Sequence, residues 1–272
     1  MKKLLCKSIA VVAILAMYFL CTGFSSTRAT RGDGNVVSSE KTVSEFQKIN
    51  SVGTANVRFH ASDKHRVVVT VDANLYEYVE ISTRNGVLHI EIKAKGEQRR
   101  RNRFIHIDKK PTQFVVDVYA PTLSGVSIAG SGSFTAVDKV VAPTFAATVA
   151  GSGRISGTFE SSNFSGKISG SGSINGTFEG SRFSANISGS GRITAAGASE
   201  NADVTISGSG SFNGNNFNAK NATVRISGSG IANVCVENSL EARVSGSGNI
   251  NYCGNPPTVN SNVSGSGIVR KM

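Results

Sequence analysis

Few residues of this chain have types and spacings that could support chemistry. Glu160 and Glu179 lie 19 residues apart, and a repeating structure that stacked them could use them as general acid and base on a glycosidic bond. The four histidines lie between residues 60 and 106 without a ligand spacing, and no zinc pattern occurs. We therefore predict a protein that is not an enzyme and that binds no metal or other cofactor, with a glycan-active enzyme as the alternative.

The N-terminal residues have the pattern of a bacterial export signal. Three lysines precede the apolar run from Ile9 to Leu20, and small residues follow it. Because this run is short for a membrane span, we predict a signal peptide over residues 1–29 and no transmembrane segment in the mature chain. The large residue before Cys21 disfavours lipidation of that cysteine. We expect an exported protein in the periplasm, at the outer membrane or on the cell surface.

The positive charge of the chain is concentrated in one stretch. The formal net charge is +11, and much of it falls between residues 93 and 110. An exposed basic loop between strands can contact an anionic glycan or an envelope or host protein. We predict no nucleic-acid partner, because an exported chain seldom meets one. The candidate binding residues in this loop are Lys93, Lys95, Arg99, Arg100, Arg101 and Arg103.

A repeat of about 19 residues covers the second half of the chain. An apolar residue lies two positions before each repeated Gly-Ser-Gly triplet, and another lies four positions after its first glycine. Apolar positions at even offsets are typical of strands, and a fixed period of this length is typical of repeat architectures. The triplets begin at Gly130, Gly151, Gly170, Gly189, Gly208, Gly228, Gly246 and Gly265.

The repeat predicts an all-β fold, a parallel β-solenoid (β-helix) with about 19 residues per coil. The crossover rule favours a right-handed one. Ile, Val and Phe would stack inside, while Asn, Thr and Ser would form polar ladders outside. Residues 30–41 are predicted to be a flexible lead and residues 42–272 a single β-helical domain. Within that domain, 42–120 form irregular strands and 121–272 form the Gly-Ser-Gly coils.

Cys235 and Cys253 occupy the same position of adjacent repeats. Each lies seven residues after the start of its triplet. Stacked coils lie about 4.8 Å apart, a separation between Cα atoms that a disulfide can bridge, and export permits oxidation. We predict a disulfide between them, with two free thiols as the alternative.

The motifs Gly-Ser-Gly-Ser-Ile-Asn (170–175) and Gly-Ser-Gly-Asn-Ile-Asn (246–251) give the chain a family resemblance. Together with Phe-Gln-Lys-Ile at 46–49, they resemble the head GIN domain family of auto-transporter adhesins, which is common in Bacteroidetes envelopes. The resemblance covers roughly residues 42–270. It implies a β-helical envelope domain and carries no catalytic residues.

Three functions are consistent with this sequence. The first is a non-enzymatic adhesion or interaction domain of the cell envelope that presents its β-helix surface to a glycan or protein. The alternatives are a glycan-active β-helix enzyme, similar to polysaccharide lyases or hydrolases, and a purely structural periplasmic scaffold. Because solenoid edges are open to pairing, a homo-oligomer is compatible with each of them.

Overall fold

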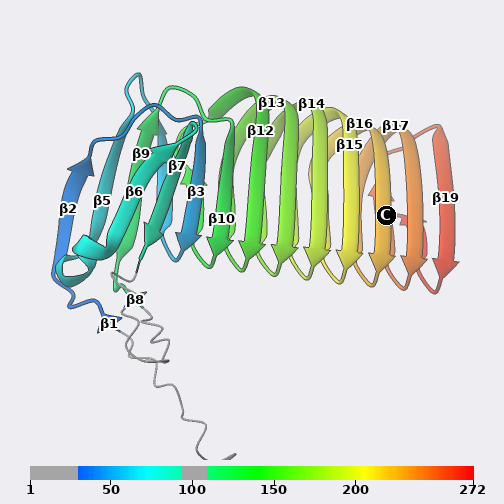
Figure 1. Ribbon diagram of the computed structural model, residues 1–272. Helices are drawn as coiled ribbons and strands as arrows, with labels where there is room; N and C mark the ends of the chain where they lie inside the picture. The colour runs from blue at the N-terminus through cyan, green and yellow to red at the C-terminus, as the bar shows by residue number, and fades with distance from the viewer. Residues whose placement is uncertain (1–29, 94–108) are drawn as a thin grey trace, which may run out of the picture. The chain divides into compact units, whose positions relative to one another are not determined.

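The computed structural model describes residues 30–93 and 109–272, which form strands connected mostly by tight turns (Figure 1). Residues 32–93 and 111–272 make up one compact unit. The other unit contains the short parallel pair of β1 (Thr30–Arg31) and β8 (Lys109–Lys110). The predicted signal peptide lies outside the described residues.

Parallel strands stack in register through the larger unit, which confirms the predicted β-solenoid. Ile155 pairs with Ile174 and Ile174 pairs with Ile193, so that one step along the stack is one repeat along the chain. Each long strand forms most of one coil and ends at the first glycine of a triplet. The long strands are β12 (Val140–Gly151), β13 (Arg154–Gly170), β14 (Ser173–Gly189), β15 (Arg192–Gly208), β16 (Ser211–Gly228) and β17 (Ile231–Gly246).

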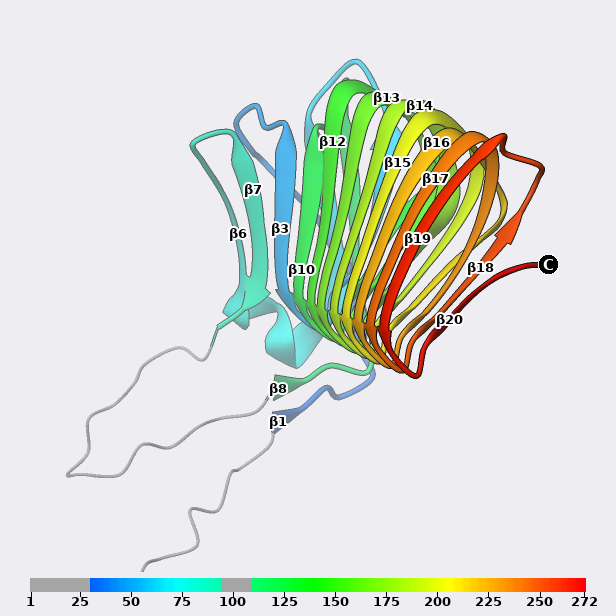
Figure 2. The same ribbon diagram turned by 90° about the vertical axis from the view of Figure 1, so that its right-hand side faces the viewer.

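The larger unit has two faces, because each coil bends within its long strand and again at its Gly-Ser-Gly corner (Figure 2). We call face A the strand segments that lead into the corners and face B the segments that leave them. β10 (Gly125–Gly130) and β19 (Thr258–Gly265) belong to face A. β11 (Ser133–Ala136), β18 (Asn249–Cys253) and β20 (Ile268–Lys271) belong to face B.

The strands before the triplets extend both faces. β3 (Lys48–Gly53) and β4 (Asn56–Ala61) form a coil that pairs in parallel with β10 and β11. On its other side, β7 (Val87–Ile92) pairs with β3 and β9 (Phe114–Ala120) pairs with β4. The coil of β3 and β4 is therefore enclosed between segments that come later in the chain.

Antiparallel strands complete the N-terminal end of the unit. β6 (Val79–Arg84) pairs with β7, and β5 (Arg66–Asp72) pairs with β9. The 3-10 helix η1 (Ala73–Tyr78) connects β5 to β6. Residues 30–41 differ from the predicted flexible lead, because Val36–Lys41 forms strand β2 along β5. The outer edge of β5 offers backbone groups that need hydrogen-bond partners, and β2 supplies them.

Stacked apolar side chains fill the interior between the faces. Ile174 is fully buried, as are its partners in the neighbouring coils. Phenylalanine rings stack from coil to coil, with 5.5 Å between the centroids of Phe159 and Phe178 and 5.5 Å between those of Phe164 and Phe183. Such ring pairs contribute about 0.5–1.5 kcal/mol each beyond the burial of their area.

The Gly-Ser-Gly corners require glycine at both ends. The first glycines have φ between +111° and +123°, a backbone region that side chains with a Cβ rarely adopt. A Cβ on Gly170 would lie 2.6 Å from the carbonyl oxygen of Gly151, and a Cβ on Gly172 would lie 2.6 Å from that of Gly153. Ser171 N meanwhile donates to Gly151 O over 2.9 Å. The corners thus stack more closely than any other residue type permits.

Asp72, at the end of β5, joins two segments that are distant in the chain. Its buried carboxylate accepts hydrogen bonds from Gly34 N (2.9 Å), from Thr112 N (2.8 Å) and from the Thr112 hydroxyl. Burial acts to raise the pKa of the Asp72 carboxyl, but the bonds from Thr112, Gly34 and Gln113 outweigh it and hold the pKa below its ordinary value of 3.8. The ionised carboxylate therefore anchors the residues before β2 and β9.

We expect Ile174→Asp to unfold the solenoid or to lower its stability by about 4 kcal/mol or more, because it places an unpaired charge in the core. Asn175→Asp is the matched control, since the neighbouring side chain points away from the core. Thermal unfolding followed by circular dichroism measures both variants. An unchanged melting temperature for Ile174→Asp would contradict the core described here.

Asp72→Asn should lower the free energy of unfolding at pH 7 by about 1–3 kcal/mol, because an amide cannot accept all the bonds that the carboxylate accepts. Because the folded-state pKa is depressed, this contribution is present above about pH 4 and is lost as the pH falls through the folded-state pKa. Urea titrations from pH 7 downward measure the difference between wild type and variant, with Asp63→Asn in an exposed loop as the control. A difference that stays constant down to low pH would argue against this role.

Candidate functional site

The predicted basic loop is described only at its start. Lys93 Nζ lies 2.6 Å from Glu80 and 2.9 Å from Glu91. Hydrogen bonds to these two carboxylates raise the pKa of Lys93. Carboxylates on β6 and β7 therefore balance its charge. The other predicted residues of the loop, which lie outside the described residues, are Lys95, Arg99, Arg100, Arg101 and Arg103.

Cys235 and Cys253 are register partners in β17 and β18. Their Cα atoms lie 4.5 Å apart, and a disulfide joins them. It links two adjacent coils on face B. A closed loop of this length restricts the unfolded chain and stabilises the fold by about 3 kcal/mol in the chain-entropy model.

Glu160 and Glu179 are also register partners, as their spacing predicts. Both side chains are exposed, and Glu160 forms an ion pair with Lys139 at 2.6 Å. Neither glutamate lines the recesses described below. Stacking alone therefore does not place them in a site.

Face A presents three columns of outward side chains. In β15, Asn201, Asp203 and Thr205 point outward, whereas the residues between them are buried. Register extends each of these positions into a column along the stack. The first column is Thr144, Asn163, Arg182, Asn201, Asn221, Ser239 and Thr258. The second is Ala146, Ser165, Ser184, Asp203, Thr223, Glu241 and Asn260, and the third is Thr148, Lys167, Asn186, Thr205, Arg225, Arg243 and Asn262.

Two recesses hollow face A along these columns. The recess nearer the N-terminal end has a volume of 530 Å³ and the other one of 290 Å³. Arg182 lines both, so the two adjoin, and we call them together the face A groove. Its lining residues run from Lys48 in β3 to Asn260 in β19. At a strand spacing of about 4.8 Å, the groove extends for about 38 Å across the strands.

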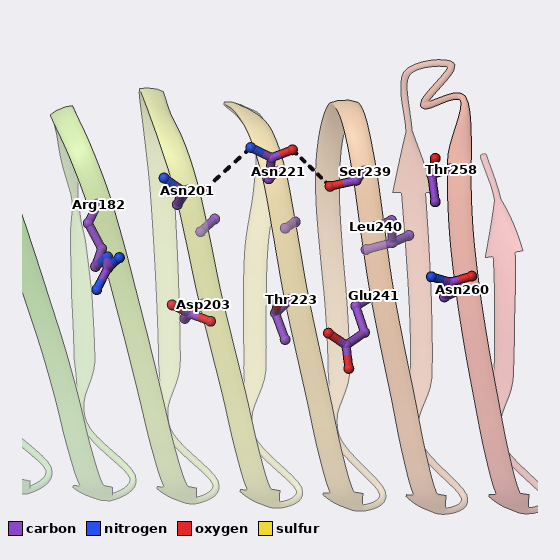
Figure 3. Close-up of a pocket in the computed structure, with 12 residues that line it drawn as sticks. Arg182, Asn201, Asp203, Asn221, Thr223, Ser239, Leu240, Glu241, Thr258 and Asn260 are labelled. Carbon is purple, nitrogen blue, oxygen red and sulfur yellow. Dashed lines mark hydrogen bonds between the residues drawn. The ribbon is translucent and has the colours of Figure 1, made fainter.

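The recess nearer the C-terminal end is bordered by a row of hydrogen-bonded side chains (Figure 3). Asn221 Nδ2 donates to Asn201 Oδ1 over 3.4 Å, and Ser239 Oγ donates to Asn221 Oδ1 over 2.8 Å. Asp203 lies two residues after Asn201 and Glu241 two residues after Ser239, at the next outward position of each strand (Figure 3). The recess therefore offers amide, hydroxyl and carboxylate groups within reach of one ligand.

The recess nearer the N-terminal end is less polar. Ala146 contributes exposed apolar surface to it, the buried rings of Phe145 and Phe164 lie beneath it, and Lys48 and Arg182 contribute positive charge. No carboxylate is among the described residues that line it. The two recesses thus differ in charge although they form one groove.

A second charged cluster lies on face B near the N-terminal end. Arg58 donates two hydrogen bonds of 2.6 Å to Asp117, and His60 Nε2 lies 3.2 Å from Asp117 Oδ1. Burial acts to raise the pKa of the Asp117 carboxyl, but the hydrogen bonds with Arg58 and His60 outweigh it and lower the pKa. Arg66 lies 4.1 Å above the Tyr119 ring, on which His60 also stacks. The hydrogen bonds and ring contacts among these groups connect β4, β5 and β9.

The sequence does not predict the face A groove. The alternation of polar and buried residues before each triplet does indicate an outward polar face. Which polar positions line a recess depends on where the long strands bend, and no single residue type recurs at that bend from coil to coil. The basic loop, in contrast, is conspicuous in the sequence because its charges are contiguous.

The fold and the groove define a repeat protein with a packed interior and a groove on one outer face. Among residues 30–93 and 109–272, no group of three His, Cys, Asp or Glu residues could hold a metal ion. In the same residues, no helix has the length and apolarity required to cross a membrane.

Residues 45–256 match the family described as "Putative auto-transporter adhesin, head GIN domain". The match spans most of the chain, so the chain belongs to this family, and the resemblance noted from its motifs is confirmed. No curated protein matches the sequence.

Solved structures of similar proteins share the fold. A "Putative lipid binding protein" from Parabacteroides distasonis ATCC 8503 is 28% identical with a TM-score of 0.83, over 90% of this chain and 100% of that one. A "putative adhesin" from the same strain is 25% identical with a TM-score of 0.81, over 90% and 100% of the two chains. Another, from Parabacteroides merdae ATCC 43184, is 23% identical with a TM-score of 0.80, over 90% and 99%.

Proposed function

We propose that this chain is a non-enzymatic adhesion domain of the cell envelope that binds a linear glycan along the face A groove. The observation that carries the proposal is the groove, two adjoining recesses that cross the strands and are lined largely by polar side chains. Membership of the adhesin family supports an adhesion-type role. The relatives named above are described as adhesins or as a lipid-binding protein rather than as enzymes.

The direction of the groove favours an extended ligand. It crosses the strands at right angles, so a chain lying in it meets one coil after another at steps of about 4.8 Å. This step is similar to the length of one pyranose residue. Successive sugars of a linear glycan can therefore contact equivalent side chains of successive coils, which a folded protein partner could not do along the whole groove.

The chemistry of the groove suits sugar hydroxyl groups. Asn221 and Ser239 offer both donors and acceptors, and their mutual hydrogen bonds hold the side chains in place. Ala146 adds exposed apolar surface at the other end, which suits the carbon-bound hydrogens of a sugar ring. A glycan presents both kinds of surface on each residue.

The carboxylates of the groove fit binding better than cleavage. Glycoside hydrolysis needs two carboxyl groups that flank one bond. Asp203 and Glu241 are separated by Thr223 on the coil between them, about 10 Å at the strand spacing, which is at the upper limit for a pair that cleaves with inversion. Glu241 also forms an ion pair with Arg243 at 2.6 Å. Glu160 and Glu179 are adjacent but lie outside the groove.

We propose further that residues 1–29 direct export, that Cys21 is not lipidated, and that the domain is displayed on the cell surface. The basic residues from Lys95 to Arg103 would then provide a second contact to anionic groups. Protease treatment of intact cells should degrade the protein, whereas a periplasmic marker should survive. Degradation only after the outer membrane is opened would favour the periplasmic scaffold instead.

Thr223→Trp should reduce binding of a linear polysaccharide at least tenfold, because the indole would fill the recess nearer the C-terminal end. Asn213→Trp is the matched control, since it makes the same addition on the same strand but on face B. Binding is measured on immobilised linear polysaccharides, both neutral and acidic, after equal melting temperatures have been verified.

Three outcomes would contradict the proposed function. If Thr223→Trp bound as well as wild type, the groove would not be the binding surface. Binding to phospholipid vesicles and to no polysaccharide would favour lipid binding, the role for which one of the relatives from P. distasonis is named. Release of new reducing ends from a bound polysaccharide would favour the enzymatic alternative.

A further inference from the structure

The basic side chains of face A differ from those of face B in how they are bonded. On face B, Arg154 Nε donates to Ser173 Oγ over 3.2 Å, Arg192 Nε donates to Ser211 Oγ over 3.1 Å, and Arg270 Nε donates to Asn251 Oδ1 over 2.8 Å. The outward arginines of face B are thus tied into the polar ladders of the fold.

The corresponding cations of face A are not tied in this way. Lys48, Lys167, Arg182 and Arg225 are exposed, and none of them has a hydrogen-bond or ion-pair partner among the described residues. Arg243 is the exception, because Glu241 neutralises it at 2.6 Å. Side chains that the fold does not use are available to a ligand.

These cations are spread along the stack rather than gathered at one point. Lys48 lies on β3, Lys167 on β13, Arg182 on β14 and Arg225 on β16. Four strand steps separate Lys48 from Arg182, which corresponds to about 19 Å. A small anion could reach one of these cations at most, whereas a polymer with repeated negative charges could meet several.

Arg182 occupies the central position in this arrangement. It lines both recesses of the groove, and the recess that it shares with Lys48 has no carboxylate among its described lining residues. A guanidinium can bind a carboxylate through two parallel hydrogen bonds, which gives it geometric selectivity as well as charge. Asp203, by contrast, disfavours a carboxylate in the recess nearer the C-terminal end.

We infer that the face A groove selects acidic linear polysaccharides, and that Arg182 is the residue that determines this specificity, with Lys48 as a further contact in the groove. Lys167 and Arg225 lie in the third column, beside the lining of the groove, and provide flanking contacts. This inference rests on the proposed function, because it names the ligand class of the same groove. Carboxylates of the polysaccharide contact the recess shared by Lys48 and Arg182.

The test compares polygalacturonate with its methyl ester, in which each carboxylate is replaced by an uncharged ester. Wild type should bind polygalacturonate at least tenfold more tightly. The triple variant Lys167→Gln, Arg182→Gln and Arg225→Gln should lose this preference, and Arg182→Gln alone should lose most of it. The matched control is the face B triple variant Arg154→Gln, Arg192→Gln and Arg270→Gln, which removes the same charge and should stay within twofold of wild type.

Each outcome separates the inference from the proposed function on which it rests. Equal losses in the two triple variants would mean that net charge alone attracts the polymer, and would overturn the inference. Equal binding of the two ligands by wild type, with both abolished by Thr223→Trp, would leave the groove as the binding site and refute acidic selectivity. Acid-selective binding that survives Thr223→Trp and the face A triple variant would place the site elsewhere and refute both.

Discussion

The close approach of consecutive corners is the constraint on which the rest of the solenoid depends. A side chain on the first glycine of a triplet would collide with the carbonyl oxygen of the corner before it. Without that side chain, the backbone hydrogen bonds of the stack continue through the turn, as from Ser152 N to Gly130 O over 2.9 Å. Once the corners are in register, residues at one offset form a column, and both the packed interior and the outer columns follow.

Each corner connects two faces whose outward side chains differ in arrangement. Inward positions are mostly apolar, because each one packs on its equivalent above and below. Outward positions have no such restriction, so face B uses them for ladders such as Asn251 on Asn233, joined over 2.8 Å. Face A uses them to border a groove. Outward residues can therefore vary without disturbing the residues of the core.

Much of this architecture is predictable from the sequence because its period is local. The triplets predict the coils, the alternation predicts the core, and equal offsets bring Cys235 and Cys253 together. Strand β2 is not predictable, because its partner β5 becomes its neighbour only in the folded chain. The sequence does not indicate that Lys93 forms ion pairs, because its partners Glu80 and Glu91 are brought to it by the hairpin of β6 and β7. The groove requires the position of a bend at which no residue type recurs from coil to coil, unlike the glycines of the corners.

The coil of β3 and β4 gives the chain an unusual order of assembly. From β12 onward, each coil pairs with the one just before it, so these coils can be added one after another by closing short loops. Asn56 and Ser133, however, meet across 77 residues. β3 and β4 can therefore complete their pairing only when β7 and β9 are in place on one side and β10 and β11 on the other. We therefore expect the N-terminal end to fold more slowly than the regular coils, because its strands must close longer loops before they pair.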